Sequence, residues 1–413
     1  SNTTDVVHSL SINSVIVGRG TGNVVSNTVV GSNSFSSNTT GAFNVAIGVN
    51  SLASNISGAY NVALGGSALL SNTIGLNNIG IGVNALYFNT TGSSNTAVGT
   101  YALQNNIANN NSAFGHQSLF NNTTGASNTA MGYLTLNTNV IGINNSAFGH
   151  YALYANTTSN NSGFGYKALR SNTTGAYNVA VGSSALVSNT IGIRNNALGV
   201  NALLSNTTGN NNNAFGYYAL RNNTIGTANS AFGHQSLQGN TTGVNNSAFG
   251  FQSLIYNTVG KYNCSFGYRS LFNNIAGSNN SAFGYLALKN NTTNNNSAFG
   301  YRSLFSNTIG TSNSAFGYKS LTSNTTGVSN VAVGTNALTS NTIGTNNVAV
   351  GVNASHNNNA GINNVGLGNN TLFQNTGGGQ NTAVGHQALQ NNTTNNNSAF
   401  GYKALFANTV GVS

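Results

Sequence analysis

The chain has 413 residues, of which eleven are Lys or Arg and one is Asp or Glu, so its formal net charge is +10 and only 3% of its residues are charged. The only carboxylate side chain is that of Asp5, which excludes paired-carboxylate hydrolysis, an acidic Ca²⁺ or Mg²⁺ site and a Ser-His-Asp triad. One Cys excludes an intrachain disulfide and a Cys-based zinc site, and no apolar run is long enough to span a membrane.

The first part of the chain differs from the rest. Residues 1–12 lie outside any repeat, and a shortened 14-residue repeat begins at Asn13. We therefore expect residues 1–26 to form an atypical N-terminal segment, as a partial cap or a joining strand.

From Asn27 onward, residues 27–413 consist of one short unit repeated 23 times, which predicts a single repetitive domain. Nineteen repeats have 17 residues, and four have 16; the short ones start at residues 95, 145, 280 and 381. We number the positions of each repeat as slots 1 to 17, starting at its first Asn, and name each coil by that Asn. The consensus is N-[STV]-A-[FVIL]-G-[YHV]-x-[AS]-L-x-x-N-T-[TI]-G-x-x.

The repeat predicts strands rather than helices. Slot 5 is Gly and slot 12 is Asn in all 23 repeats, and a Gly inside every helix would cost about 1 kcal/mol each time. Two short extended runs, at slots 2–6 and 7–10, separated by Asn/Gly corners fit better. We predict an all-β fold, a parallel β-solenoid or β-roll of about 23 coils.

Slots 2 and 4 compensate each other in size. Where slot 4 is Phe, slot 2 is Ser, Asn or Cys, and where slot 4 is Val, Ile, Leu or Met, slot 2 is usually Val, Ile or Thr. Residues two apart share one face of a strand, so a fixed shared volume explains the exchange. We predict that slots 2, 4 and 9 face inward, with the slot-3 Ala against another packed surface. Every Phe coil also carries Tyr, His or Phe at slot 6, which predicts aromatic ladders at a corner.

The slot-12 Asn has two interpretations. As a structural residue, it would occupy the left-handed backbone of a tight corner and bond from coil to coil in an amide ladder. The candidate residues of this ladder include Asn38, Asn72, Asn106, Asn139, Asn189, Asn223, Asn257, Asn307, Asn341 and Asn408. As acceptors of N-linked glycans, the candidates are the sequon residues Asn38, Asn55, Asn89, Asn122, Asn156, Asn172, Asn206, Asn240, Asn291, Asn324 and Asn392. Because Asn persists in the coils without a sequon, we favour the structural interpretation.

The other reactive side chains favour structural roles. His116, His150, His234 and His386 all occupy slot 6, and the closest two lie two coils apart, about 9.6 Å, which is too far to share a metal. Cys264 replaces Ser at slot 2, and we interpret it as a buried inert thiol. The sequence thus predicts no catalytic residue, no metal site and no cofactor.

Basic residues recur at two slots. Slot 10 carries Arg170, Arg221 and Lys289, whereas Arg194 and Lys261 occupy slots 17 and 16 at another corner. Such an edge could bind a polyanion, or it could provide solubility and oppose side-to-side association. We favour the second interpretation and expect no nucleic acid partner. The candidate polyanion contacts, all at slot 7, are Lys167, Arg269, Arg302, Lys319 and Lys403.

The repeats resemble those of a known group of proteins. NSVIVG at Asn13, NVAIG at Asn44 and NVAVG at Asn330 and Asn347 resemble repeats in the heads of trimeric autotransporter adhesins. NTAVGHQALQNNTT at Asn381 resembles Asn/Gly-rich repeats of bacterial surface and phage tail-fibre proteins. The resemblance covers nearly all of residues 13–413. It implies a left-handed parallel β-roll, often trimeric, in an extracellular fibre used for attachment.

Three classes of function follow, and the first is the one we expect. It is a structural shaft of an extracellular or surface-attached fibre, on a cell or a virion, with an adhesive role as an extension. The alternatives are an ice-binding solenoid, because slot 13 is Thr in 18 of 23 coils, and a rod that binds polyanions or polysaccharides. An enzyme is not expected.

The expected partners are further copies of the chain and, in an adhesive role, cell-surface glycans. The last coil, which starts at Asn397, is a regular copy with Phe400, Leu405 and Asn408 in their slots. A regular final coil predicts either that the chain is a piece of a longer repeat protein or that it associates head to tail with the next copy, and both place it in a filament. The resemblance to adhesin heads implies a homotrimer as the other form of self-association.

Overall fold

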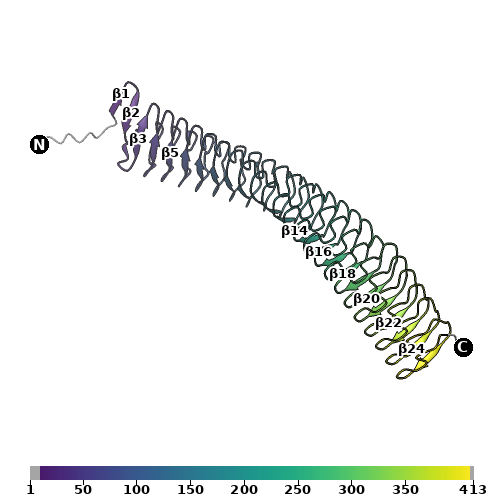
Figure 1. Ribbon diagram of the computed structural model, residues 1–413. Helices are drawn as coiled ribbons and strands as arrows, with labels where there is room; N and C mark the ends of the chain where they lie inside the picture. Colours follow the sequence, from purple (N-terminus) through teal and green to yellow (C-terminus); the bar gives the residue numbers. More distant parts are fainter. Residues whose placement is uncertain (1–9, 410–413) are drawn as a thin grey trace. The chain divides into compact units, whose positions relative to one another are not determined.

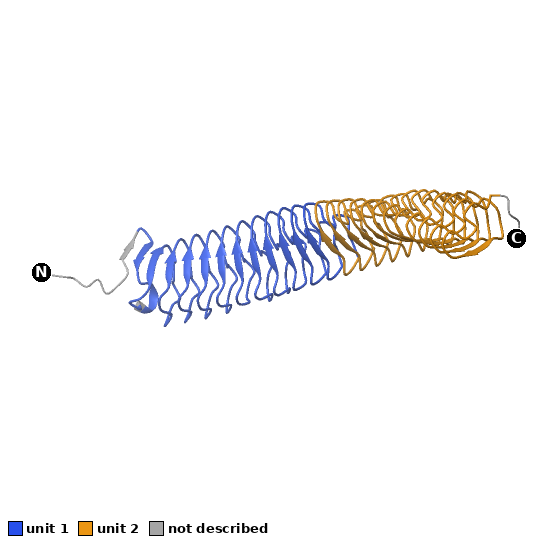
Figure 2. Cartoon of the chain, turned by 60° about the horizontal axis from the view of Figure 1, so that its bottom comes forward, with its two compact units in different colours: residues 1–208 blue, residues 209–413 orange. Residues whose placement is uncertain are grey.

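Each repeat forms one coil of a parallel β-solenoid, with one short strand per coil (Figure 1). The computed structural model describes residues 10–409 and divides the chain into two units, the first ending at Thr208 and the second beginning at Gly209 (Figure 2). Within the described residues, the only helical element is the 3-10 turn η1 (Thr21–Asn23). The predicted fold class is therefore confirmed, whereas a single domain over residues 27–413 stays a prediction.

Unit 1 contains thirteen strands among its described residues. They are β1 (Leu10–Ile12), β2 (Val15–Gly18), β3 (Thr28–Gly31), β4 (Val45–Ile47), β5 (Val62–Leu64), β6 (Ile79–Ile81), β7 (Thr96–Val98), β8 (Ser112–Phe114), β9 (Thr129–Met131), β10 (Ser146–Phe148), β11 (Ser162–Phe164), β12 (Val179–Val181) and β13 (Asn196–Leu198). From β4 onward, each strand occupies slots 2–4 of its repeat, and β3 occupies slots 2–5.

Unit 2 contains twelve strands in the part of the chain that the structure describes. They are β14 (Asn213–Phe215), β15 (Ser230–Phe232), β16 (Ser247–Phe249), β17 (Cys264–Phe266), β18 (Ser281–Phe283), β19 (Ser297–Phe299), β20 (Ser314–Phe316), β21 (Val331–Val333), β22 (Val348–Val350), β23 (Val365–Leu367), β24 (Thr382–Val384) and β25 (Ser398–Phe400). Neighbouring strands pair in parallel with each slot opposite the same slot, as in Phe232 opposite Phe249. This register places every side chain in a ladder of equivalent side chains.

The segment before the first coil is antiparallel. Strand β1 pairs with β2, and β2 pairs with β3, with Val17 opposite Val30. Gly20 lies against Phe35, which takes the place of Leu at slot 9 and is fully buried. Residues 15–20 therefore cover the strand edge and the end of the core at the first coil of unit 1.

The core of each coil is made of small and medium side chains, and it lies on the side of the strand opposite to the one that we expected. In the coils before the last one, the Ala at slot 3, the Ala or Ser at slot 8 and the Leu at slot 9 are buried, as in Ala248, Ser253 and Leu254. Slots 2 and 4 instead point outward, so the prediction that both face inward is wrong; only the slot-9 part is confirmed. The Phe at slot 4 are mostly half-buried, because they stack on one another outside the core.

The reason for this inversion is the narrow cross-section of the coil. A Cβ built on Gly80 or Gly163, which occupy slot 3, would lie 3.2 Å from the Cγ of the Leu of the preceding coil. The space beyond slot 3 is thus largely filled by Leu, so Phe cannot be placed there without overpacking. The slot-3 residues larger than Ala are Ser265 and, in the first coil, Val29. The size compensation between slots 2 and 4 does describe one shared face, but that face is the outer one.

Left-handed backbone occurs at fixed slots. Gly at slot 5 has φ between 118° and 149°, and a Cβ on Gly300 would lie 2.3 Å from the carbonyl oxygen of Gly317, so only Gly fits. Slots 7, 9 and 17 also have positive φ in the described coils, although none of their residues is Gly. The slot-9 Leu residues, with φ between 47° and 53°, accept a local cost of about 1–2 kcal/mol each. Burial of the whole Leu side chain, about 1.5–3 kcal/mol, offsets that cost.

The slot-12 Asn residues form the expected ladder inside the coils. In the regular coils, the side-chain nitrogen donates to the side-chain oxygen of the preceding coil and to the carbonyl of the slot-15 Gly, as Asn72 does to Asn55 at 2.9 Å and to Gly75 at 3.2 Å. The amide ladder is confirmed. The expected left-handed backbone is wrong, because the slot-12 Asn residues of the described coils do not have positive φ.

A second ladder, which sequence reasoning missed, runs through the slot-1 Asn. The backbone N–H of Asn246 donates to the Oδ1 of Asn229 at 3.0 Å, and its Nδ2 donates to the same oxygen at 3.1 Å and to Gly260 O at 2.8 Å. The signal was present in the sequence, since this Asn begins all 23 repeats.

Candidate binding face

The reactive side chains do not come together. Within residues 10–409, no cluster of three or more His, Cys, Asp or Glu could hold a metal ion, and Asp5 lies outside this range. Cys264 is half-buried on the outer face rather than in the core, which corrects its expected position. Desolvation there raises the pKa of the Cys264 thiol above its ordinary value.

Aromatic ladders cover the outer face, as the slot-6 pattern predicted. In unit 2, the slot-4 Phe rings stack from Phe215 to Phe316, with centroids 4.4–4.9 Å apart. Beside them, a slot-6 ladder runs from Tyr217 through His234 to Tyr318, with centroids 5.2–5.4 Å apart. The rings are close to parallel, so each ring covers the flat face of its neighbour and leaves its edge toward solvent.

The expected slot-6 His residues are part of these ladders. In unit 1, His116 and His150 lie on either side of Tyr133, and in unit 2, His234 lies between Tyr217 and Phe251. The ring centroids of His386 and Tyr402 are 5.6 Å apart. These contacts support the structural interpretation of the His residues.

Slots 7, 10 and 11 form a third surface, which we call the cationic face. Slots 7 and 10 are neighbours there, since the guanidinium of Arg302 lies 4.3 Å from the ring centroid of Phe305 and that of Arg269 lies 5.1 Å from Phe272. Of the five candidate polyanion contacts of slot 7, Lys403 is exposed and the other four are half-buried. All five contact aromatic rings. Arg194 and Lys261 are exposed at the slot-16 and slot-17 corner, as the slot assignment requires.

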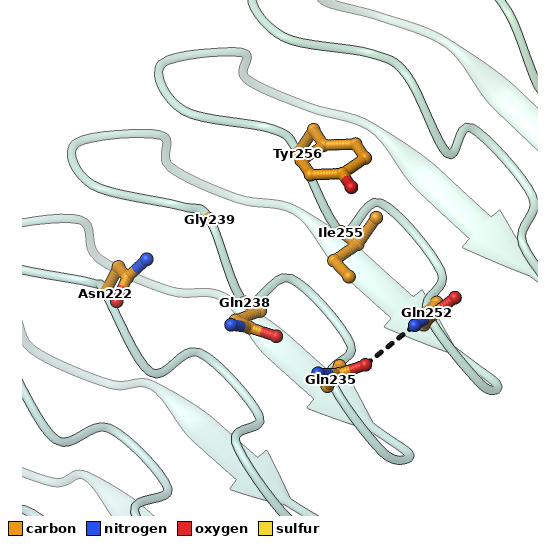
Figure 3. Close-up of a pocket in the computed structure, with 7 residues that line it drawn as sticks. All are labelled: Asn222, Gln235, Gln238, Gly239, Gln252, Ile255 and Tyr256. Atoms are coloured by element: carbon orange, nitrogen blue, oxygen red, sulfur yellow. Dashed lines mark hydrogen bonds between the residues drawn. The ribbon is translucent and has the colours of Figure 1, made fainter.

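A cavity of about 290 Å³ opens on this face in unit 2 (Figure 3). It exists because Gly239 has no side chain, whereas the equivalent slot-11 residues of the two adjacent coils are Asn222 and Tyr256. The remaining wall consists of three glutamine side chains and one aliphatic side chain: Gln235, Gln238, Gln252 and Ile255.

The amides at this cavity are partly fixed. Gln252 Nε2 donates to Gln235 Oε1 at 2.7 Å, and Arg269 Nε donates to Gln252 Oε1 at 2.7 Å. The Oε1 of Gln238 is buried at the wall without a hydrogen-bond partner. The side chain of Tyr256 is 50% exposed. The cavity thus combines hydrogen-bonding amides, one accessible ring and a nearby guanidinium.

The sequon Asn residues lie inside the coils. All eleven side chains are at most 2% exposed, and their nitrogens donate hydrogen bonds within the coils, as Asn324 does to Asn307 at 2.7 Å. A glycan bonded to such a nitrogen cannot be accommodated while the coil is folded. Glycosylation of these residues would therefore have to precede folding and would oppose it.

The Thr at slot 13 form a row, but their hydroxyls are engaged. Thr73 Oγ1 donates to Thr90 O at 3.0 Å, and Thr325 Oγ1 donates to Thr342 O at 3.0 Å. These hydroxyl groups donate their hydrogens to carbonyl oxygens of the next coil. The row therefore presents fewer free hydrogen-bond donors to water than an ice-binding surface of Thr would need.

The chain matches none of the protein-family models against which it was scanned, and a search of curated proteins found no relative. In residues 10–409, no helix has the length and apolar character needed to cross a bilayer.

Proposed function

We propose that the chain is a non-catalytic structural shaft of an extracellular fibre. The observation that carries this proposal is the identical register of successive coils within each unit, from β3 to β13 and from β14 to β25. Backbone bonds connect the coils in that same register, and Asn side-chain ladders and, in part of each unit, stacked rings add to them. A coil so bonded on both sides can be repeated without a change in its contacts, which is the requirement for a shaft.

The composition supports a structural role rather than a chemical one. The single carboxylate and the slot-6 His stacked between rings leave no arrangement of acid, base and nucleophile on the described surface. The resemblance to adhesin heads and tail-fibre repeats supports an extracellular or surface-attached location.

Self-association is part of the proposal, in a head-to-tail filament or a homotrimer. At the first coil, strand β2 covers the edge of β3 in antiparallel orientation. A head-to-tail contact at this end would therefore meet a hairpin rather than an open coil. The exposed aromatic ladders, which run along the coils, would suit a lateral contact such as a trimer.

The test compares the full chain with a variant in which residues 212–279, four regular coils, are duplicated. A shaft predicts that the longest dimension from small-angle X-ray scattering rises by about 19 Å, four coils at the strand spacing, while the cross-section stays constant. Light scattering on both proteins reports the number of chains. A cross-section that grows with the duplication would contradict the proposal.

A further inference from the structure

The cationic face of unit 2 has cations in regular succession. Four successive coils, starting at Asn263, Asn280, Asn296 and Asn313, each contribute one basic residue from slot 7 or slot 10. These residues are Arg269, Lys289, Arg302 and Lys319. Unit 2 has no Asp or Glu side chain. No carboxylate side chain of unit 2 can therefore pair with these four residues.

The cations of this face contact neighbouring side chains. Arg269 is fixed by Gln252 and by the rings of Tyr268 and Phe272, at 5.3 and 5.1 Å. Lys289 and Arg302 share the ring of Phe305, at 5.3 and 4.3 Å. Ordering these side chains in advance lowers the entropy lost when a ligand binds. The face is thus prepared for a linear partner with regularly spaced negative charges.

The cavity beside these cations can hold an uncharged part of a ligand. Its volume of about 290 Å³ is near the lower limit of small-molecule pockets. Its wall is rich in amides, which donate to and accept from hydroxyl groups, and the exposed ring of Tyr256 can cover the apolar face of a sugar ring. It lies next to Arg269 through the hydrogen bond of that residue to Gln252.

We propose that this face binds a linear acidic polysaccharide, with one sugar ring seated beside Tyr256 and its carboxylate or sulfate groups along Arg269, Lys289, Arg302 and Lys319. This binding activity is additional to the proposed structural role, because a shaft needs no ligand. A single-stranded nucleic acid fits less well, since such strands stack their bases on open ring faces. In the slot-6 ladder, the faces of Tyr285 and Tyr301 are covered by neighbouring rings on both sides.

The experiment measures binding of the full chain to polygalacturonate, heparin, dextran and poly(dT) by calorimetry at two salt concentrations. We expect binding to polygalacturonate, to heparin or to both, stronger than to dextran or poly(dT). The double variant Arg302→Gln/Lys319→Gln should lose affinity at least about tenfold and lower the salt slope by about two. The matched control Arg194→Gln/Lys261→Gln removes the same charge from another corner and should change affinity less than about twofold.

The cavity is tested separately by Tyr256→Ser, which introduces a residue that is common at slot 11 of other coils. This variant should weaken polysaccharide binding without a change in the salt slope, because it removes no charge. Circular dichroism establishes that each variant is folded. Equal losses in the two double variants, an unaffected Tyr256→Ser, or binding to poly(dT) as strong as to both acidic polysaccharides would overturn the proposal. So would absence of binding to either acidic polysaccharide.

Discussion

The regular coils and the four short coils differ by one residue at one corner, and the difference shows what holds the corner together. In a regular coil such as the one starting at Asn296, the slot-12 residue Asn307 donates to Asn291 of the preceding coil at 2.7 Å. In the short Asn145 coil, Asn156 donates only to Thr158 O, and the Oδ1 of Asn139 is left without a partner. At the other three short coils, the equivalent bond is 3.4 or 3.5 Å long.

The short coils recover part of what they lose. The slot-1 Asn of the next coil turns toward the slot-12 oxygen, as Asn161 does to Asn156 at 3.1 Å and Asn296 does to Asn291 at 3.0 Å. The two ladders are therefore joined at each short coil. One missing residue redirects the hydrogen bonds, whereas the strand and the core stay in register.

The largest expected effect tests whether the difference is confined to that corner. Gly300→Ala in a regular coil and Gly149→Ala in the short Asn145 coil both place a Cβ within 2.5 Å of a carbonyl oxygen, at a φ that favours Gly. Each should destabilise its coil by about 3 kcal/mol or more. Hydrogen exchange with mass spectrometry measures the local loss of stability. The control is Gly66→Ala, whose added Cβ meets no atom within 4 Å. Markedly unequal losses would show that the two kinds of coil differ at the strand as well.

A core substitution tests how much packing contributes to the stability of a coil that lacks the slot-9 Leu. Ser355 replaces Leu at slot 9, is 1% exposed, and has an Oγ without a partner. Ser355→Leu should stabilise the Asn347 coil by about 2 kcal/mol, because it fills the core and removes an unpaired hydroxyl. Denaturant titration measures the gain, and Ser340→Leu at the half-buried slot 11 is the control. If Ser355→Leu lowers the stability, Gly366 and Thr371 have already closed the space.

Reciprocal changes of coil length address the comparison directly. Insertion of Gly after Thr158 makes the Asn145 coil regular, and deletion of Gly310 makes the Asn296 coil short. We expect the insertion to stabilise and the deletion to destabilise by about 1–2 kcal/mol each, the cost of one buried polar group without its partner. Denaturant titration of both variants measures the sign of each change in the free energy of unfolding. Changes of the same sign would mean that loop length, not the Asn bond, determines the stability.

The smallest effect concerns pH. The pKa of Cys264 is raised in the folded chain, so folding favours the protonated thiol. The stabilisation of the folded chain that comes from this shifted pKa is complete below the pKa of the unfolded thiol. It is lost as the pH rises through the pKa of the folded state. Stability should therefore fall slightly in alkaline solution, and Cys264→Ser, which introduces the usual slot-2 residue, should remove that fall. An unchanged alkaline slope in the variant would assign the effect to other groups.

Much of this architecture could be predicted from spacing, but the direction of the side chains could not. Parallel register, the slot-12 ladder, the slot-6 ladder and partly exposed slot-7 cations all follow from the repeat itself. The outward position of Phe249 does not, because size compensation between slots shows only that two residues share a face. The cavity depends on one Gly at slot 11, and the redirected bonds of Asn161 depend on the three-dimensional path of a shortened corner.

The one-way orientation of the slot-12 ladder has an electrical consequence. From Asn55 to Asn139 in unit 1, each amide donates toward the preceding coil, so the amide dipoles add rather than cancel. Hydrogen bonds in such a chain polarise one another, by about 10–30% per bond. The addition stops at Asn139, whose oxygen is the negative end of the run, and it begins again from Asn156 to Asn206. Unit 1 is thus polarised along its coils in two segments, and a single missing residue separates them.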